Sequence, residues 1–222
     1  MGATGHKTPT YPVNLDLDGV PCLVVGAGKI AARKVAGLLD CGAAVTVVAP
    51  EAVDELRDDG RVRWHEREYR RGEVASYRVA VSATGVRAVD EQVSRDARAV
   101  GIPVNVADVP ELCTFTLPSI VRRGDLQVAV STNGRSPAFA SWVRDRIDDS
   151  LGAHLLDALN LLAETRLAVK ASGRSTEHHG WFLAFEKGFV DLVAQGRTAE
   201  ARALLRDCLD FHPDGDPAAV TP

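Results

Sequence analysis

A glycine-rich turn that could bind a pyrophosphate follows an apolar run near the start of the chain. The run 21–25 precedes Gly26, Gly28 and Ala31, in the order Gly-x-Gly-x-x-Ala. Gly26 would permit a sharp turn, Gly28 would let the backbone approach a pyrophosphate, and Ala31 would let a helix pack closely on the strand. Free N–H groups at the helix start would then face the phosphates. The motif predicts a dinucleotide site, although glycines after a strand can also serve only a turn.

Asp108 is a carboxylate that could take part in proton transfer. It follows the predicted strand 102–106 by two residues, where its side chain would reach over a nicotinamide bound at the sheet edge. An Asp before Val-Pro is also common as a turn cap. On the residues alone, a catalytic base and a turn cap are equal readings of Asp108.

The elements around these residues indicate an α/β fold. Ile30, Val35 and Leu38 share one helix face, Gly42 ends that helix, and the β-rich run 44–49 completes a βαβ unit. Thr84 and Gly85 follow another predicted strand, at the sheet edge where ligands bind in such folds. We therefore predict a Rossmann-like parallel sheet. Its other strands are expected at 11–19 (an edge strand ending in an Asp-Gly turn), 62–66, 78–83 and 102–106, with an amphipathic helix over 86–100.

The pattern changes after residue 112. Residues 113–117 are strand-like, 119–131 have the form of a hairpin around Gly124-Asp125, and Ser136-Pro137 is a strong helix start. Helices are expected to continue to a break near Gly152 and then over 181–195 and 198–209. This predicts a Rossmann domain at 11–111, a dimerisation region at 112–150 and a helical domain at 151–211, with 1–10 and 212–222 disordered.

Composition excludes several classes of protein. The 222 residues are 45% hydrophobic and 25% charged, without an apolar run long enough to span a membrane. The net charge of −4 argues against a nucleic-acid partner, so an acidic substrate would need a local basic patch. The four cysteines are scattered, which indicates neither a permanent metal site nor a disulfide framework. The polar first ten residues do not resemble a secretion signal, so we expect a cytoplasmic protein without a membrane partner.

Five stretches in one order carry a resemblance to a known family. They are 24–34 (VVGAGKIAARK), 47–51 (VVAPE), 105–108 (NVAD), 115–119 (FTLPS) and 129–137 (AVSTNGRSP). Together they resemble the precorrin-2 dehydrogenase and sirohydrochlorin ferrochelatase family, the dehydrogenase part of siroheme synthase. The likeness covers about residues 11–165 and is more specific than the glycine turn alone.

The resemblance implies an oxidoreductase that converts precorrin-2 to sirohydrochlorin with NAD as cofactor, and a homodimer built through the segment after residue 112. In some members it also implies insertion of Fe²⁺ or Co²⁺, held only transiently. It makes Asp108 the leading catalytic residue, and Arg135 with the following helix start would bind substrate carboxylates. The expected cofactor-binding residues are Gly26, Gly28, Lys29, Ile30, Pro50, Glu51, Thr84, Gly85 and Asn105; the expected substrate-binding residues are Ser131, Thr132, Asn133, Gly134, Arg135 and Ser136.

The end of the strand 44–49 departs from the usual NAD fingerprint. An acidic residue normally stands there to hold the ribose hydroxyls, but Ala49 and Pro50 occupy the position. Glu51, or the backbone of Pro50 and Glu51, could serve instead. Since no arginine stands directly at this strand end to favour a 2′-phosphate, we expect NAD rather than NADP.

Two other functions remain open. One is a dedicated chelatase for iron or cobalt whose nucleotide site is vestigial, which failure to bind NAD would indicate. The other is a non-catalytic nucleotide-sensing module, which has no reason to keep Asp108 or the loop 131–137.

Overall fold

The computed structural model describes residues 9–211, so the predicted disorder of 212–222 and most of 1–10 lies outside the described residues. The chain divides into two compact units. The first runs to Leu117 and includes Asn133–Arg135; the second comprises Pro118–Thr132 and the chain from Ser136 onward. The division into three functional regions stays a prediction.

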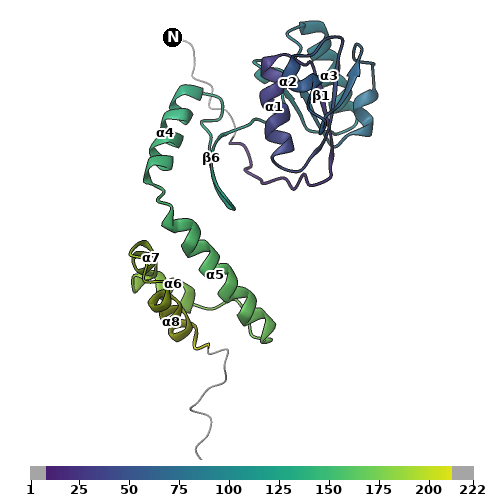
Figure 1. Ribbon diagram of the computed structural model, residues 1–222. Helices are drawn as coiled ribbons and strands as arrows, with labels where there is room; N and C mark the ends of the chain where they lie inside the picture. Colours follow the sequence, from purple (N-terminus) through teal and green to yellow (C-terminus); the bar gives the residue numbers. More distant parts are fainter. Residues whose placement is uncertain (1–8, 212–222) are drawn as a thin grey trace, which may run out of the picture. The chain divides into compact units, whose positions relative to one another are not determined.

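The first unit is built on a parallel sheet, shown in purple to blue in Figure 1. Among the described residues this sheet has five strands in the order β3-β2-β1-β4-β5. The predicted Rossmann-like fold is thereby confirmed. The strands are β1 (Pro21–Val25), β2 (Ala44–Ala49), β3 (Arg63–Glu66), β4 (Val79–Ser82) and β5 (Val104–Val106).

Helices cover both faces of this sheet because its strands are apolar on both sides. Helices α1 (Lys29–Leu39) and α2 (Asp54–Arg57) share one buried cluster with β1 and β2, whereas α3 (Arg87–Ala99) packs with β4 and β5 on the other face. Short 3₁₀ helices stand at Glu73–Ser76 (η1) and Pro110–Leu112 (η2). The connections from β1 and β4 leave on opposite faces, which opens a crevice at the carboxyl ends of these strands, the usual ligand position.

The predicted edge strand over 11–19 is wrong. Residues 9–17 belong to no strand, and Tyr11 and Val13 are 89% and 61% exposed. Only the Asp18-Gly19 turn forms, with Gly19 in the left-handed region and its N–H bonded to the Gly42 carbonyl. The apolar alternation resembles a strand, but β3 and β5 hold the two edges of the sheet and no strand pairs with the segment.

The predicted strand over 113–117 is also absent. Thr114 makes a backbone hydrogen bond to Val104, but the carbonyl of Phe115 is bonded by the side chain of Asn105. A side chain has thus replaced the next ladder bond, and Pro118 follows closely. This segment bends at Thr114 and Phe115 and is bonded to β5 without forming a strand.

The second unit contains the predicted hairpin and a set of helices. Ser136 caps α4 as predicted, its hydroxyl accepting the N–H of Phe139 at 3.2 Å. The helix predicted over 181–195 is wrong as a single element, because Gly188 adopts a left-handed φ of 84° and divides it. Elements are β6 (Ser119–Arg123), β7 (Leu126–Val130), α4 (Pro137–Ser150), α5 (His154–Ala171), α6 (Gly180–Glu186), α7 (Phe189–Ala194) and α8 (Thr198–Leu209).

Contacts join α4 to the β6–β7 ribbon, α5 to α7, and α8 to both α6 and α7. Phe189 and Leu205 are fully buried in the helical core.

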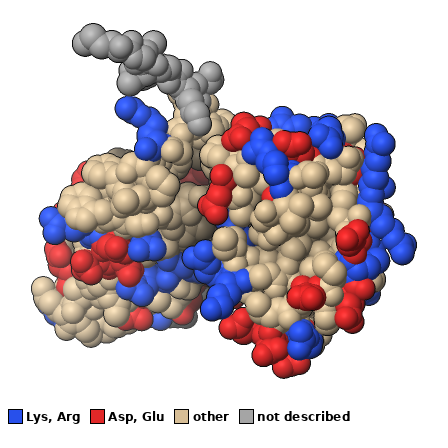
Figure 2. Space-filling view, turned by 90° about the horizontal axis from the view of Figure 1, so that it is seen from above, with Lys and Arg blue, Asp and Glu red and all other residues tan. Residues whose placement is uncertain are grey.

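On the face seen in Figure 2, basic and acidic side chains lie interspersed on both units, consistent with the net charge of −4. Within residues 9–211, no helix is both long enough and apolar enough to span a membrane.

Candidate active site

Gly26 is required by the turn after β1. Its φ is +96°, a region that L side chains avoid, and a Cβ at this position would collide with the backbone of Ala83 after β4. The N–H of Gly26 bonds the Val48 carbonyl at 2.9 Å. The turn is therefore held between the ends of the neighbouring strands β2 and β4.

Gly28 serves a different purpose. Its backbone is extended, and a Cβ would meet no atom within 4 Å, so the fold itself does not demand glycine here. Gly28 is the N-cap of α1, whose first turn has no side-chain cap and no acidic residue. The exposed Lys29 follows. The uncapped N–H groups at the start of α1 are therefore accessible, which suits the binding of a dinucleotide pyrophosphate.

A pocket of about 230 Å³ lies beside this turn, within the first unit. Three of its lining residues, Ile30, Gly85 and Asp108, were predicted from the sequence as cofactor or catalytic residues. The structure therefore brings these three together at one end of the sheet. The complete lining is Ile30, Ala83, Gly85, Arg87, Asp90, Ala107, Asp108 and Val109.

Asp108 is exposed in this pocket and has a left-handed backbone, with φ of 59°. The preceding Ala107 continues the sheet by bonding the Ser82 carbonyl at 2.9 Å. The chain then turns away at Asp108. Its carboxylate stands where β5 ends, as predicted.

Asp90 is a pocket residue that the sequence reasoning missed. Its side chain is 4% exposed and accepts hydrogen bonds from the hydroxyls of Ser82 at 2.6 Å and Thr84 at 2.8 Å. The Thr84 side chain thus anchors the loop that carries Gly85. A carboxylate on the buried helix face beside Val93 was the available signal, since an acidic residue is rarely buried without a partner. Arg87, another pocket residue that was not predicted, had no such signal in the sequence.

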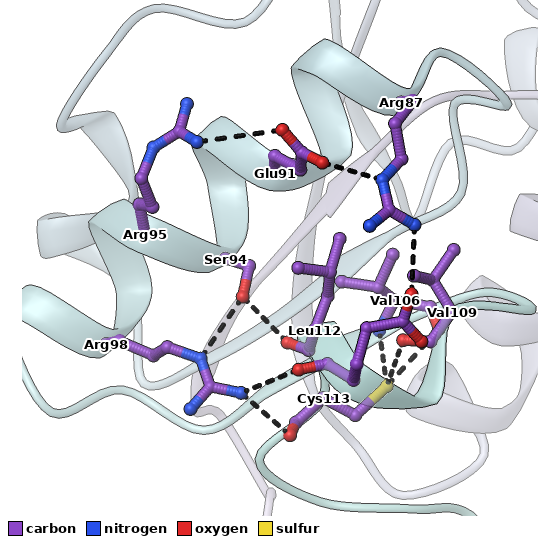
Figure 3. Close-up of polar contacts among 10 residues, drawn as sticks. Arg87, Glu91, Ser94, Arg95, Arg98, Val106, Val109, Leu112 and Cys113 are labelled. Carbon is purple, nitrogen blue, oxygen red and sulfur yellow. Dashed lines mark hydrogen bonds and ion pairs between the residues drawn. The ribbon is translucent and has the colours of Figure 1, made fainter.

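Helix α3 holds the chain after Asp108 (Figure 3). The Ser94 hydroxyl donates to the Leu112 carbonyl at 2.7 Å, and Arg98 donates to the Cys113 carbonyl at 3.0 Å. Arg87 bridges Glu91 at 2.7 Å and Glu111 at 3.1 Å. The end of this loop, from Glu111 to Cys113, is therefore attached to a regular helix.

Asn105, a predicted cofactor residue, does not line the pocket. It is 7% exposed, and its amide donates to the Phe115 carbonyl at 3.1 Å. Lys34, one helical turn after Ile30, is half-buried. Burial and the neighbouring Arg33 lower the pKa of Lys34, while Asp108 and Cys113 act to raise it. A lysine ammonium group thus stands within electrostatic range of the Asp108 carboxylate.

At the end of β2, Pro50 and Glu51 are exposed and outside the pocket lining. The expectation that no arginine stands here needs correction, because the N–H of Arg67 donates to the Ala49 carbonyl at 3.2 Å. The Arg67 guanidinium is held by Glu73 at 2.6 and 3.1 Å. Partial burial acts to raise the Glu73 pKa, but hydrogen bonds from Arg67 and the Arg70 N–H outweigh it and lower this pKa.

The loop of predicted substrate residues builds the start of α4. The Thr132 hydroxyl bonds both the N–H and the carbonyl of Ser136 at 3.1 Å, while Asn133 and Gly134 have left-handed backbones. Ser131, Gly134 and Arg135 are exposed. Within residues 9–211, no group of His, Cys, Asp and Glu side chains could hold a metal ion.

Two family models match this chain. The model described as "Putative NAD(P)-binding" covers residues 13–119, which agrees with the predicted NAD cofactor. The model described as "Sirohaem biosynthesis protein central" covers residues 123–150.

Curated relatives include the siroheme synthases of Methylococcus capsulatus, 38% identical over 204 residues, and of Methylobacillus flagellatus, 38% identical over 205. Each match covers 90% of this chain but only 43% and 44% of the relative, so the chain spans less than half their length. The solved structure of SirC, precorrin-2 dehydrogenase, is similar with a TM-score of 0.69 and 26% identity, covering 91% of this chain and 100% of SirC. These matches confirm the predicted resemblance to the precorrin-2 dehydrogenase family, the dehydrogenase part of siroheme synthase.

Proposed function

We propose that this chain is an NAD-dependent dehydrogenase that oxidises precorrin-2 to sirohydrochlorin in siroheme biosynthesis. One observation supports this proposal most directly: the Asp108 carboxylate lies in the same pocket as Ile30. Ile30 stands at the start of α1, whose free N–H groups suit a pyrophosphate. The similarity to SirC, precorrin-2 dehydrogenase, supports the choice of substrate.

NAD would be held by the residues around the glycine turn. The backbone from Gly26 to Ile30 would bind the pyrophosphate, Pro50 and Glu51 the adenosine ribose, and the Gly85 loop the other half of the cofactor. When bound, NAD⁺ supplies a hydride acceptor. The Arg67–Glu73 pair at the β2 end favours NAD over NADP, since Arg67 is already engaged.

Asp108 would act as the general base. Oxidation of the macrocycle removes a hydride and a proton, and the Asp108 carboxylate takes the proton and later releases it to water. The Lys34 ammonium stands within electrostatic range of this carboxylate. Ser131, Thr132, Asn133, Gly134, Arg135 and Ser136 would bind the carboxylates of the tetrapyrrole, with Arg135 providing the charge.

The second unit would form a homodimer. Phe139 and Trp142 stack with ring centroids 5.7 Å apart and are 55% and 54% exposed, and Ile120 of the ribbon is 42% exposed. Exposed aromatic groups of this kind are usual at interfaces. We assign the two-fold contact to this surface and the reaction to the cytoplasm.

The deciding experiment is incubation of the purified protein with precorrin-2 and NAD⁺. NADH absorbance and the sirohydrochlorin spectrum should rise together. Formation of neither, with NAD bound, would favour the nucleotide-sensing module. Fe²⁺ or Co²⁺ added to sirohydrochlorin without NAD tests ferrochelatase activity separately, and metal insertion by a chain that cannot bind NAD would favour the dedicated chelatase.

A further inference from the structure

The turn that carries Asp108 is held only weakly by its own backbone. A left-handed conformation is unfavourable for a residue with a Cβ, and such conformations persist when surrounding contacts stabilise them. The hydrogen bond across this turn, from the Val109 N–H to the Val106 carbonyl, is long at 3.4 Å. The orientation of the Asp108 carboxylate must therefore depend on contacts from outside the turn.

The thiol of Cys113 provides such contacts on both sides of Asp108. Its sulfur accepts the Val106 N–H at 3.1 Å, and its proton can be donated to the carbonyl of Val106 at 3.3 Å or of Val109 at 3.4 Å. Val106 stands two residues before Asp108 and Val109 one residue after it. Figure 3 shows the sulfur between these backbone groups, closing the loop into a ring.

Cys113 is itself anchored to helix α3. Its carbonyl accepts a bond from Arg98, and the adjacent Leu112 carbonyl accepts one from Ser94. The anchor matters because a thiol on a mobile segment could not fix the turn. Through these bonds the loop that carries Asp108 is fixed to α3, a regular helix of 13 residues.

We infer that Cys113 is a positioning residue, whose thiol holds the Asp108 turn in the conformation that the reaction requires. This inference rests on the proposed role of Asp108. Removal of the thiol leaves the Val106 N–H and the Val109 carbonyl without this partner, so the turn relaxes and the carboxylate moves. Because small displacements of a catalytic group are costly, we expect kcat of Cys113→Ala to fall about 10-fold or more. The KM for NAD⁺ should change little, since the turn at Gly26 and Gly28 is untouched.

The test combines kinetics with amide hydrogen exchange on the full chain. In Cys113→Ala, exchange at residues 107–112 should become about 10-fold faster, and Cys113→Ser, which keeps a donor and an acceptor, should restore most of both losses. The matched control is Cys22→Ala, at the start of β1 and fully buried. It should lower the melting temperature while leaving kcat and exchange at 107–112 unchanged.

Wild-type exchange at 107–112 in folded Cys113→Ala would overturn the inference, as would equal losses of kcat in Cys113→Ala and Cys22→Ala. If Cys113→Ala does not fold, Cys113→Ser and Ser94→Ala provide the test. Amide exchange at 107–112 should be fast in Ser94→Ala and slow in Cys113→Ser. The reverse result would contradict the inference. If the wild type binds NAD but does not oxidise precorrin-2, the proposed function fails. The exchange data then still decide whether the thiol holds the turn.

Discussion

The two units of this protein cover their apolar residues in different ways. In the first, β1 and β4 are buried on both faces, and the large apolar side chains exposed at the ends of its helices, such as Ile30 and Val100, are aliphatic. In the second, Trp142 on α4 and Phe182 on α6 are 54% and 66% exposed. The first unit contains a complete pocket, whereas the second presents aromatic surface. We infer that chemistry belongs to the first unit and assembly to the second, and the predictions below test one role or the other.

The largest effect is expected at Asp108. Asp108→Ala should lose about 100-fold or more in kcat while the protein folds, dimerises and binds NAD, because only the base is removed. Asp108→Asn is the cleaner variant, since Asn tolerates the left-handed backbone and isolates the loss of the carboxylate. Steady-state kinetics, light scattering and NAD titration measure these properties. Near-native turnover in either variant would remove Asp108 from the mechanism.

Gly28 and Gly26 form a matched pair within one turn. Gly28→Val should weaken NAD binding about 100-fold and leave the melting temperature nearly unchanged, because a Cβ there meets only the open space intended for the pyrophosphate. Gly26→Val should destabilise the fold itself, because its Cβ would overlap the Ala83 backbone. Calorimetric NAD titration and thermal melts distinguish the two. Normal NAD affinity in folded Gly28→Val would refute the cofactor assignment.

Trp142 tests the second unit. Trp142→Asp should weaken the dimer about 30-fold or more, as expected when a central interface tryptophan is lost, and leave NAD binding in the first unit unchanged. Light scattering across a dilution series measures the dimer. Arg146, whose guanidinium stacks on the Trp142 ring with its central carbon 5.2 Å from the ring centroid, provides a milder variant, Arg146→Gln. A wild type that is monomeric at micromolar concentration would reject the assembly proposal.

The smallest effect is expected at the β2 end. Glu73→Gln should release the Arg67 guanidinium and raise the ratio of kcat/KM for NADP to that for NAD about 3- to 10-fold, because a free arginine can pair with a 2′-phosphate. Arg67→Gln added to Glu73→Gln should cancel the gain. Glu66→Gln, an exposed carboxyl one residue from Arg67, is the control. An unchanged ratio in Glu73→Gln would show that Arg67 does not reach the 2′ position.

Prediction from sequence succeeded where a local pattern had a single structural solution. The glycine turn, the periodic helix faces and the Ser136-Pro137 helix start all describe contacts between residues close in the chain. It failed at 11–19 and 113–117, where the alternating pattern did not show whether the segment would pair with a strand. Residues 11–19 pair with none, and at 113–117 the Asn105 side chain takes the Phe115 carbonyl that a ladder bond would use. Gly188 was passed over because a single glycine within a helical pattern does not reveal its φ.

Residues close in the chain were sufficient to locate the glycine turn, Asp108 at a strand end and the resemblance to a known family, because their spacing reflects local turns and helix starts. Only the folded chain decided that Asp90 and Arg87 share a pocket with Asp108, that Arg67 stands beside Ala49, and that Cys113 closes the Asp108 turn. The bonds of Cys113 span only four to seven residues and depend on how the loop is bonded to α3. The other contacts join segments that are brought together by the order of strands in the sheet. That order is determined by the burial of both sheet faces, a property of the whole domain that no short stretch of sequence contains.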